Sequence, residues 1–332
     1  MKAVRVHSYG KRPSVDDVPE PAVTGAFDVL VEVGAAGLCR TDLHIVEGQW
    51  AEKTGVQLPY VIGHENAGWV REVGSAVTNV APGDAVILHP LVTCGLCRPC
   101  RSGDDVHCEN SKFPGIDTDG GMAQFLLTNA RSVVKLAPGL EPAAVAALAD
   151  AGLTAYHAVR KAVPLLYPGT TCVVIGAGGL GHIGVQCLLA MTAARVIVVD
   201  PSERARELAT ELGAHEVRAT GDGLDGSAQV VLDFVGERGA EKQGLAMTRR
   251  AGSYFVIGYG GSIDIPTIDL ISTERNIIGN LVGSYNDLDE LMTLAAQGKV
   301  KLHTKTYPLA AVNEAMDDLD AGRLPGRGIL VP

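Results

Sequence analysis

Four cysteines lie close together, with two residues between each of the first three and seven residues before the fourth. They are Cys94, Cys97, Cys100 and Cys108. A tetrahedral zinc ion needs four soft ligands from a tightly turned chain, with zinc–sulfur distances of about 2.3 Å. Gly95, Pro99 and Gly103 supply turn-forming residues between these thiols. The spacing predicts a structural zinc site, and the alternatives are a disulfide cluster or scattered reduced thiols.

A glycine-rich loop follows the apolar run Cys172–Ile175. The loop matches the pattern G-x-G-x-x-G through Gly176, Ala177, Gly178, Gly179, Leu180 and Gly181. A strand before this loop and a helix over His182–Met191 give it the context of a dinucleotide-binding site, in which the helix N-terminus receives the pyrophosphate. The alternative is a nucleotide-binding fold that has lost its ligand.

Asp200 ends the next expected strand, Val196–Val199, and follows Gly181 by 19 residues. An acidic side chain at this point accepts hydrogen bonds from the adenosine ribose and repels a 2′-phosphate. The pattern therefore favours NAD over NADP, although Ser202 and Arg204 could receive a phosphate.

A third set of polar residues is spread over three distant segments of the chain. Cys39-Arg40-Thr41-Asp42-Leu43-His44 is one segment, Gly63-His64-Glu65 is the next, and Asp150 precedes an expected helix. A catalytic zinc takes three protein ligands and keeps its fourth position open. Spacing alone does not show that these segments meet, and each residue has an ordinary structural explanation as a buried thiol, a hydrogen-bonded histidine or a helix-associated acid.

The elements that must position these residues change character near residue 150. Before it, short alternating stretches such as Val29–Val33, Ala67–Val73 and Asp84–Leu88 predict a β-rich, barrel-like domain. After it, strands and helices alternate, which predicts a doubly wound parallel sheet and an α/β fold class. We expect a catalytic domain of residues 1–150 plus 300–332, with a Rossmann domain of residues 151–299 inserted in it.

The composition limits the function classes. The chain has 332 residues and a net charge of −10, from 28 basic and 38 acidic residues, which argues against nucleic acid and anionic membranes as partners. No uninterrupted apolar run is long enough for a membrane span, and the stretch 183–199 is interrupted by Gln186, Thr192 and Arg195. The start of the chain reads as a strand rather than a signal peptide, and dispersed thiols at other positions fit the reducing cytoplasm.

Taken together, these motifs resemble the zinc-dependent medium-chain alcohol dehydrogenases over essentially the whole chain. The resemblance rests on C-R-T-D-L-H at 39–44, G-H-E at 63–65, the four-cysteine loop, D-A-G-L-T at 150–154, G-A-G-G-L-G at 176–181, Asp200 and the terminal G-R-G-I-L-V-P. It implies a GroES-like barrel domain with an inserted NAD-binding domain. It also implies two zinc ions per chain and a homo-oligomer, a tetramer rather than a dimer.

The resemblance also implies roles for single residues. Cys39, His64 and Asp150 match the ligands of the catalytic zinc, and Asp150 stands where many members have cysteine. Glu65 matches an acid that approaches this zinc, and Asp42 matches the carboxylate that orients the ligand histidine. The remaining matches are Thr41 and His44 in a proton relay, and Arg40 and Arg327 at the cofactor pyrophosphate.

The implied activity is the reversible oxidation of primary or secondary alcohols to aldehydes or ketones, with hydride transfer to NAD from an alkoxide held on zinc. The partners would be small-molecule alcohols and carbonyl compounds. Three alternatives stay open on the same fold: a polyol dehydrogenase, a zinc-free quinone or enoyl reductase, and a non-enzymatic NAD(H)-binding sensor. The zinc-ligand set argues against the reductase, and the relay pair argues against the sensor.

Overall fold

A computed structural model describes residues 1–324 and 326–332 and divides them into two compact units. Unit 1 comprises Met1–Ala151 and Ser284–Pro332, and unit 2 comprises Gly152–Gly283. The chain passes from unit 1 to unit 2 after Ala151, close to the predicted boundary at residue 150. It returns to unit 1 at Ser284, whereas the predicted boundary was residue 300. The second boundary differs because helix α10 (Tyr285–Ala296) is bound to unit 1. The Tyr285 amide at its start donates a 2.9 Å hydrogen bond to Asp105 Oδ1.

Unit 1 is built on two sheets. In the described part of the chain, the smaller sheet has the order β2-β1-β4, and the larger has the order β15-β16-β3-β5-β6-β8 with β7 also paired to β3. These strands are β1 (Lys2–Val6), β2 (Ser14–Asp17), β3 (Asp28–Leu38), β4 (Tyr60–Val61), β5 (Glu65–Val73), β6 (Ala85–Leu88), β7 (Phe125–Asn129), β8 (Val133–Lys135), β15 (Thr304–Pro308) and β16 (Arg327–Val331).

Strands β3 and β6 bury apolar residues along most of their length. Val29, Val31 and Val33 of β3 are almost fully buried in the unit 1 core together with Val86 and Leu88 of β6. Strand β3 is longer than the expected Val29–Val33, because it pairs in turn with β7, β5 and β16. Its far end therefore reaches Leu38, immediately before the first polar segment.

The helices of unit 1 are short, apart from α10. They are α1 (Arg40–Glu47), α2 (Ala51–Thr54), α3 (Arg98–Arg101), α4 (Pro142–Val145), α10 and α11 (Val312–Asp320), and α5 (Ala151–Ala162) begins at the last residue before unit 2. Single 3₁₀ turns cover Asp105–His107, Ala130–Ser132, Ala146–Leu148 and Leu309–Ala311 in unit 1, and Val163–Leu165 in unit 2. Among the described residues, no helix combines the length and apolar character needed to cross a membrane.

Unit 2 contains a parallel sheet with the strand order β11-β10-β9-β12-β13-β14 over its described residues. Numbered within the unit, this order is 3-2-1-4-5-6, the order of a dinucleotide-binding Rossmann fold. The strands are β9 (Thr171–Ile175), β10 (Arg195–Val199), β11 (Glu216–Arg218), β12 (Ala228–Asp233), β13 (Thr248–Val256) and β14 (Asn276–Gly279). The predicted doubly wound sheet is confirmed.

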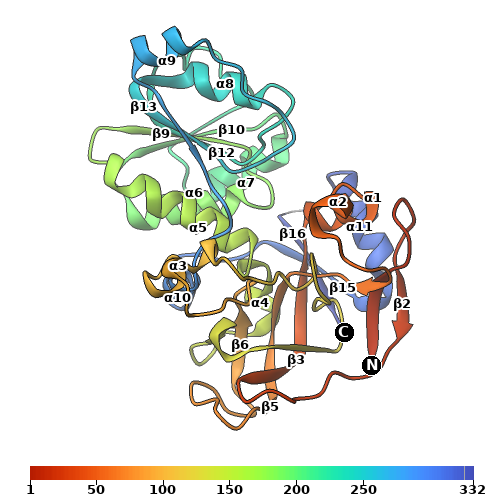
Figure 1. Ribbon diagram of the computed structural model, residues 1–332. Helices are drawn as coiled ribbons and strands as arrows, with labels where there is room; N and C mark the ends of the chain where they lie inside the picture. Colours follow the sequence, from red (N-terminus) through yellow and green to blue (C-terminus); the bar gives the residue numbers. More distant parts are fainter. Residues whose placement is uncertain (325) are drawn as a thin grey trace. The chain divides into compact units, whose positions relative to one another are not determined.

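Helices cover both faces of this sheet (Figure 1). Helices α6 and α7 lie on one side of the strands, and α8 and α9 lie on the other. The helices are α6 (Gly181–Met191), α7 (Glu203–Glu211), α8 (Ala240–Met247) and α9 (Thr267–Thr273). Because both faces are covered, β9 and β12 are buried along almost their whole length, which explains the apolar runs 172–175 and 230–232.

Candidate functional site

Two clusters in unit 1 hold the donor types that bind zinc. In the first, one ligand atom each from Cys39, His64, Glu65 and Asp150 lies within 4.8 Å of the other three. His64 Nε2 is 3.6 Å from Asp150 Oδ2. The structure therefore brings together the three distant segments whose meeting the sequence could not show.

Strand pairing explains this convergence. Strands β3 and β5 are antiparallel, and Gly37 pairs with Glu65, so the chain ends that carry Cys39 and His64 come side by side. Cys39 is also the N-cap of α1, and the Asp42 carboxylate accepts a 2.9 Å hydrogen bond from the Cys39 amide. Asp42 Oδ1 lies 3.4 Å from His64 Nδ1, so this one side chain contacts both segments.

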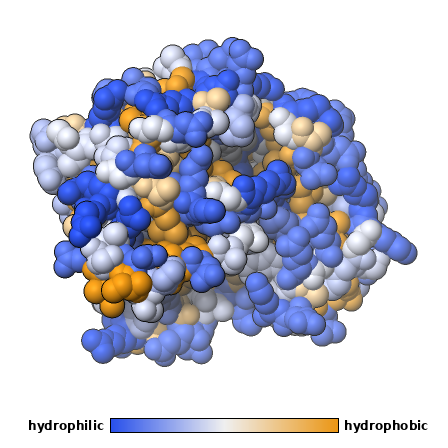
Figure 2. All heavy atoms as spheres, turned by 90° about the horizontal axis from the view of Figure 1, so that it is seen from above, coloured by the Kyte–Doolittle hydropathy of each residue, from blue (hydrophilic) through white to orange (hydrophobic). Residues whose placement is uncertain are grey.

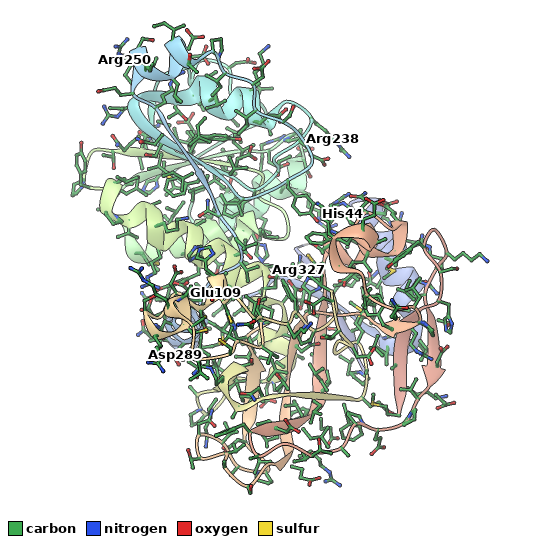
Figure 3. All side chains as sticks on the ribbon, viewed as in Figure 1. His44, Glu109, Arg238, Arg250, Asp289 and Arg327 are labelled. Carbon is green, nitrogen blue, oxygen red and sulfur yellow. The ribbon has the colours of Figure 1, made fainter. Side chains whose placement is uncertain are left out.

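The Glu65 carboxylate is completely buried and has two partners within unit 1. Its Oε1 accepts a 2.9 Å hydrogen bond from the Ala151 amide, and its Oε2 forms an ion pair with the guanidinium of Arg327. Arg327 begins β16 (Figure 3) and is 3% exposed, so its charge is neutralised inside the protein. Its expected contact with a pyrophosphate stays a prediction, while its ion pair with Glu65 was not foreseen from the sequence.

The electrostatics of this cluster favour a bound cation. Burial raises the pKa of Glu65 and of Asp150. The nearby Arg327 and His64 act in the opposite direction and lower both pKa values, but burial has the larger effect. His64 Nε2 and Asp150 Oδ1 are buried and have no hydrogen-bond partner, whereas His64 Nδ1 faces the Asp42 carboxylate. Buried polar atoms are almost always paired, so unpaired donor atoms from two of the ligand candidates fit a metal ion that completes them.

The α1 helix presents the other expected residues of this segment. Arg40 is exposed, whereas Thr41 and His44 are partly buried and, three residues apart, share one face of α1. Figure 3 shows His44 on this helix. Their roles in a proton relay stay a prediction.

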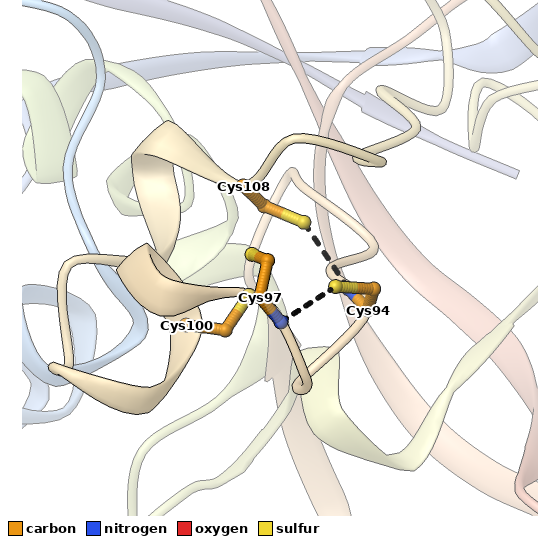
Figure 4. A group of neighbouring side chains, drawn as sticks. All are labelled: Cys94, Cys97, Cys100 and Cys108. Atoms are coloured by element: carbon orange, nitrogen blue, oxygen red, sulfur yellow. Dashed lines mark hydrogen bonds between the residues drawn. The ribbon is translucent and has the colours of Figure 1, made fainter.

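The four-cysteine loop forms the second cluster (Figure 4). Its four sulfur atoms lie within 4.8 Å of one another, and all seven cysteines of the chain are free thiols, so no disulfide competes with metal binding. The Cys94 thiol accepts hydrogen bonds from the Leu96 and Cys97 amides, at 3.5 and 3.4 Å, which lower its pKa to about 6. Burial raises the pKa of the Cys100 thiol to about 12.

The glycine loop of unit 2 lies between β9 and α6. An added Cβ on Gly181 would be 1.8 Å from the Gly176 carbonyl oxygen, so only glycine allows this turn. Strand β9 sits between β10 and β12, where the strand order reverses, and ligands of such sheets bind beyond the carboxyl ends of the strands at this point. Gly178 faces open space, which leaves room for a ligand close to the backbone.

Asp200 closes the other side of the glycine loop. Its Oδ2 accepts a 2.8 Å hydrogen bond from the Ala177 amide, and its Oδ1 accepts one from the Ser202 amide. The Ser202 hydroxyl is used as the N-cap of α7. The expected acid is therefore fixed beside the loop, and Ser202 is less suited to receive a phosphate than the sequence suggested.

Phe113 is a residue of the first cluster that sequence reasoning missed. Its ring meets the His64 imidazole edge to face, with ring centres 5.8 Å apart and planes at 89°. Phe113 follows the four-cysteine loop and belongs to no recognisable motif. Only the folded structure places it beside a candidate ligand.

Comparison with known proteins identifies relatives of this chain. Residues 25–138 match the family described as the alcohol dehydrogenase GroES-like domain, and residues 179–297 match the zinc-binding dehydrogenase family. The chain is 36% identical to an NAD-dependent alcohol dehydrogenase of Sulfolobus acidocaldarius, covering 99% of both chains. It is 34% identical to a D-arabinose 1-dehydrogenase (NADP(+)) of Saccharolobus solfataricus, covering 100% of this chain and 97% of that one.

A solved structure indicates the same family as the sequence relatives. The crystal structure of the alcohol dehydrogenase from the hyperthermophilic archaeon Aeropyrum pernix superposes with a TM-score of 0.96 at 44% identity, covering 100% of both chains. The match extends over both units, and the GroES-like and Rossmann expectations are confirmed. The chain belongs to the zinc-dependent medium-chain alcohol dehydrogenase family.

Proposed function

We propose that this protein is an NAD-dependent alcohol dehydrogenase that interconverts primary or secondary alcohols and the corresponding aldehydes or ketones. The observation that carries the proposal is the buried convergence of donor atoms from Cys39, His64, Glu65 and Asp150 within 4.8 Å. Full-length relatives named as NAD-dependent alcohol dehydrogenases support the same reaction class. A binding protein without turnover would not need this donor set.

The donors fit zinc, since a thiolate, an imidazole and a carboxylate are the ligands that catalytic zinc prefers. Cys39, His64 and Asp150 would hold it, and Asp42 would orient the His64 ring. Zinc at this place would act as a Lewis acid that lowers the pKa of the substrate hydroxyl, and NAD would accept the hydride. Glu65 has both carboxylate oxygens engaged by Ala151 and Arg327, which leaves Asp150 as the third ligand.

The chain's own residues would move the proton. The Thr41 hydroxyl would accept the proton of the substrate hydroxyl, and its own proton would pass through the cofactor ribose toward His44, which lies on the same face of α1. An imidazole suits this role because its ordinary pKa lies in the physiological range. Arg40, at the start of the same helix, and Arg327 would face the cofactor pyrophosphate.

The second cluster fits a structural zinc, because four thiols close a tetrahedral site and leave no position for substrate. Cys94, Cys97, Cys100 and Cys108 would hold this ion. We therefore propose two zinc ions per chain. Seven free cysteines also fit a reducing compartment, and we propose the cytoplasm as the location.

The test of the proposed function combines metal analysis with turnover. We expect about two zinc ions per chain and alcohol-dependent formation of NADH, followed by its absorbance. The substrate panel includes simple and aromatic alcohols, polyols and D-arabinose, because one relative is named as a D-arabinose dehydrogenase. One zinc ion per chain and no turnover with any of these substrates would contradict the proposal.

Asp200 is expected to set the preference for NAD. Replacing Asp200 with alanine should weaken NAD binding by about tenfold or more, because a charged hydrogen bond to a ribose hydroxyl contributes about 1.5–3 kcal/mol. The preference for NAD over NADP should narrow by a similar factor. The measurement is kcat/KM with each cofactor.

The matched control is Asp200→Asn, which keeps a side-chain oxygen for the Ala177 or Ser202 amide and removes the charge. Charge repulsion is the proposed reason for rejecting a 2′-phosphate, so this variant should also gain activity with NADP. An unchanged cofactor preference in both variants would remove Asp200 from this role.

We further propose that the protein is a homo-oligomer, a tetramer rather than a dimer. Exposed large apolar side chains are concentrated in one segment of unit 2. They are Tyr259, Ile263, Ile268, Leu270, Ile271, Ile277 and Leu281. The view in Figure 2, from above α8 and α9, shows hydrophobic side chains at the surface. Strand β14 is also the edge of its sheet, and an apolar sheet edge is commonly covered by another chain.

A second copy of the chain is the expected occupant of this surface. Ile271, which is 70% exposed, should become buried in the oligomer, so Ile271→Asp should lower the native mass measured by light scattering. Phe27→Asp, at another exposed apolar residue of unit 1, is the control and should leave the mass unchanged. A monomeric wild-type protein would contradict the proposal.

A further inference from the structure

Residues 113–122 pack against the backbone that carries His64. The Gly120, Gly121 and Met122 amides donate hydrogen bonds of 2.8, 2.8 and 2.9 Å to the carbonyl oxygens of residues 61, 63 and 62. In the reverse direction, the Val61 amide donates a 2.8 Å hydrogen bond to Asp119 Oδ1. The two segments are thus joined over the three residues that precede His64.

The contact between these segments is as close as glycine allows. A Cβ added to Gly115 would lie 2.4 Å from the Gly63 carbonyl oxygen, and one added to Gly120 would lie 2.4 Å from that oxygen and from the Gly115 Cα. The atoms in the way are backbone atoms, which cannot rotate aside. Any side chain at Gly115 or Gly120 must therefore displace the peptide that immediately precedes His64.

The same segment also contacts the imidazole itself. The Phe113 ring meets the His64 ring edge to face at 5.8 Å, and the Phe113 amide donates a 2.7 Å hydrogen bond to Asp117 Oδ1, which holds this turn. Asp42 Oδ1 lies 3.4 Å from His64 Nδ1. The His64 ring is 1% exposed and is packed between these neighbours.

We propose that residues 113–122 position the His64 imidazole for metal binding, with Gly115 and Gly120 fixing its backbone and Phe113 fixing its ring. The inference rests on the proposed role of His64 as a metal ligand. It makes these residues positioning residues, because none of them supplies a ligand atom. Their contribution is a preformed geometry, which a metal site needs if binding is not to require rearrangement of its ligands.

Gly115→Ala and Gly139→Ala form a matched pair that separates crowding from backbone strain. Gly115 has φ +88° and Gly139 has φ +89°, so alanine is similarly strained at both positions. A Cβ on Gly139 meets nothing within 4 Å, whereas a Cβ on Gly115 meets the Gly63 peptide. Only Gly115→Ala should therefore disturb His64.

The experiment measures cobalt(II) binding to full-length, metal-free protein by chelator competition, together with the visible spectrum of the cobalt form. Metal affinity at the first cluster should fall by about 10- to 100-fold in Gly115→Ala, the range for changes in groups that orient a metal ligand. The cobalt spectrum of this cluster should also change. In Gly139→Ala the affinity and spectrum of this cluster should equal those of the wild type, and in both variants the four-cysteine cluster should be unchanged. If Gly115→Ala does not fold, Phe113→Leu replaces it and should change the same spectrum.

Equal cobalt affinity and identical spectra in Gly115→Ala and Gly139→Ala would overturn the inference, as would an unchanged spectrum in Phe113→Leu. Failure of the proposed function would give a different result. The wild-type protein itself would then bind cobalt only at the four-cysteine cluster.

Discussion

Replacing Asp150 with alanine is expected to reduce kcat/KM for alcohol oxidation by about a thousandfold or more. The physical reason is that the variant leaves only Cys39 and His64 as ligands, whereas a catalytic zinc takes three from the protein. A thousandfold loss corresponds to about 4 kcal/mol of transition-state stabilisation, which is the scale of Lewis-acid catalysis. Steady-state kinetics and zinc content per chain would both be measured.

The control for this prediction is Asp150→Cys. A thiolate is a good zinc ligand, and the family resemblance places Asp150 where many members have cysteine. The cysteine variant should therefore bind about two zinc ions and keep measurable turnover, while Asp150→Ala binds about one. If the alanine variant retains full activity and both zinc ions, the third ligand is not Asp150.

Glu65 is the other acid of the first cluster, and the surroundings of the two carboxylates show which of them is available to a metal ion. Asp150 Oδ1 is buried without a hydrogen-bond partner, whereas the two oxygens of Glu65 contact the Ala151 amide and the Arg327 guanidinium. A carboxylate that moved to the metal would have to leave a buried arginine unpaired, which costs several kcal/mol. Glu65→Gln should consequently lower stability while leaving the zinc content unchanged.

The sequence predicted best those parts of the molecule whose chemistry is local. The glycine loop, the strand before it and the helix after it lie within Thr171–Met191, and neighbouring residues determine each of them. The four-cysteine loop is equally local, because its turns alone bring the sulfur atoms together. Such patterns can be recognised without knowledge of the rest of the chain.

Contacts between distant segments could not be predicted in this way. The pairing of Gly37 with Glu65 brings Cys39 and His64 together, but the sequence does not state which strands pair or in which register. The same holds for Arg327, which reaches Glu65 from the opposite end of the chain. The resemblance to a family supplied the ligand set, and the structure supplied the neighbours that hold it in place.

The position of α10 illustrates a second limit. The predicted Rossmann domain of residues 151–299 includes residues 285–296. The N-terminus of α10 is instead bound in unit 1, where Asp105 accepts a hydrogen bond from the Tyr285 amide and Val133 accepts one from the Tyr285 hydroxyl. An alternation of strands and helices predicts the fold of a domain but does not show at which residue the chain leaves it.

Replacing Cys94 with serine is expected to remove the second zinc ion and to destabilise the protein. The Cys94 thiol is held by amide hydrogen bonds, and its own amide donates a 3.3 Å hydrogen bond to the Cys108 thiol, so it lies at the centre of the loop. Loss of a structural metal is among the few changes that cost about 4 kcal/mol or more. In a chain of this size, the melting temperature should fall by about 6 °C or more.

Turnover should respond differently from stability. The first cluster shares no ligand with the four-cysteine loop, so kcat measured well below the melting temperature should stay within about threefold of the wild-type value. Cys187→Ala is the control, because Cys187 is a buried thiol of α6 outside both clusters, and it should keep about two zinc ions. Loss of turnover in folded Cys94→Ser protein that retains one zinc ion would contradict a purely structural role, because it would mean that the loop takes part in the reaction.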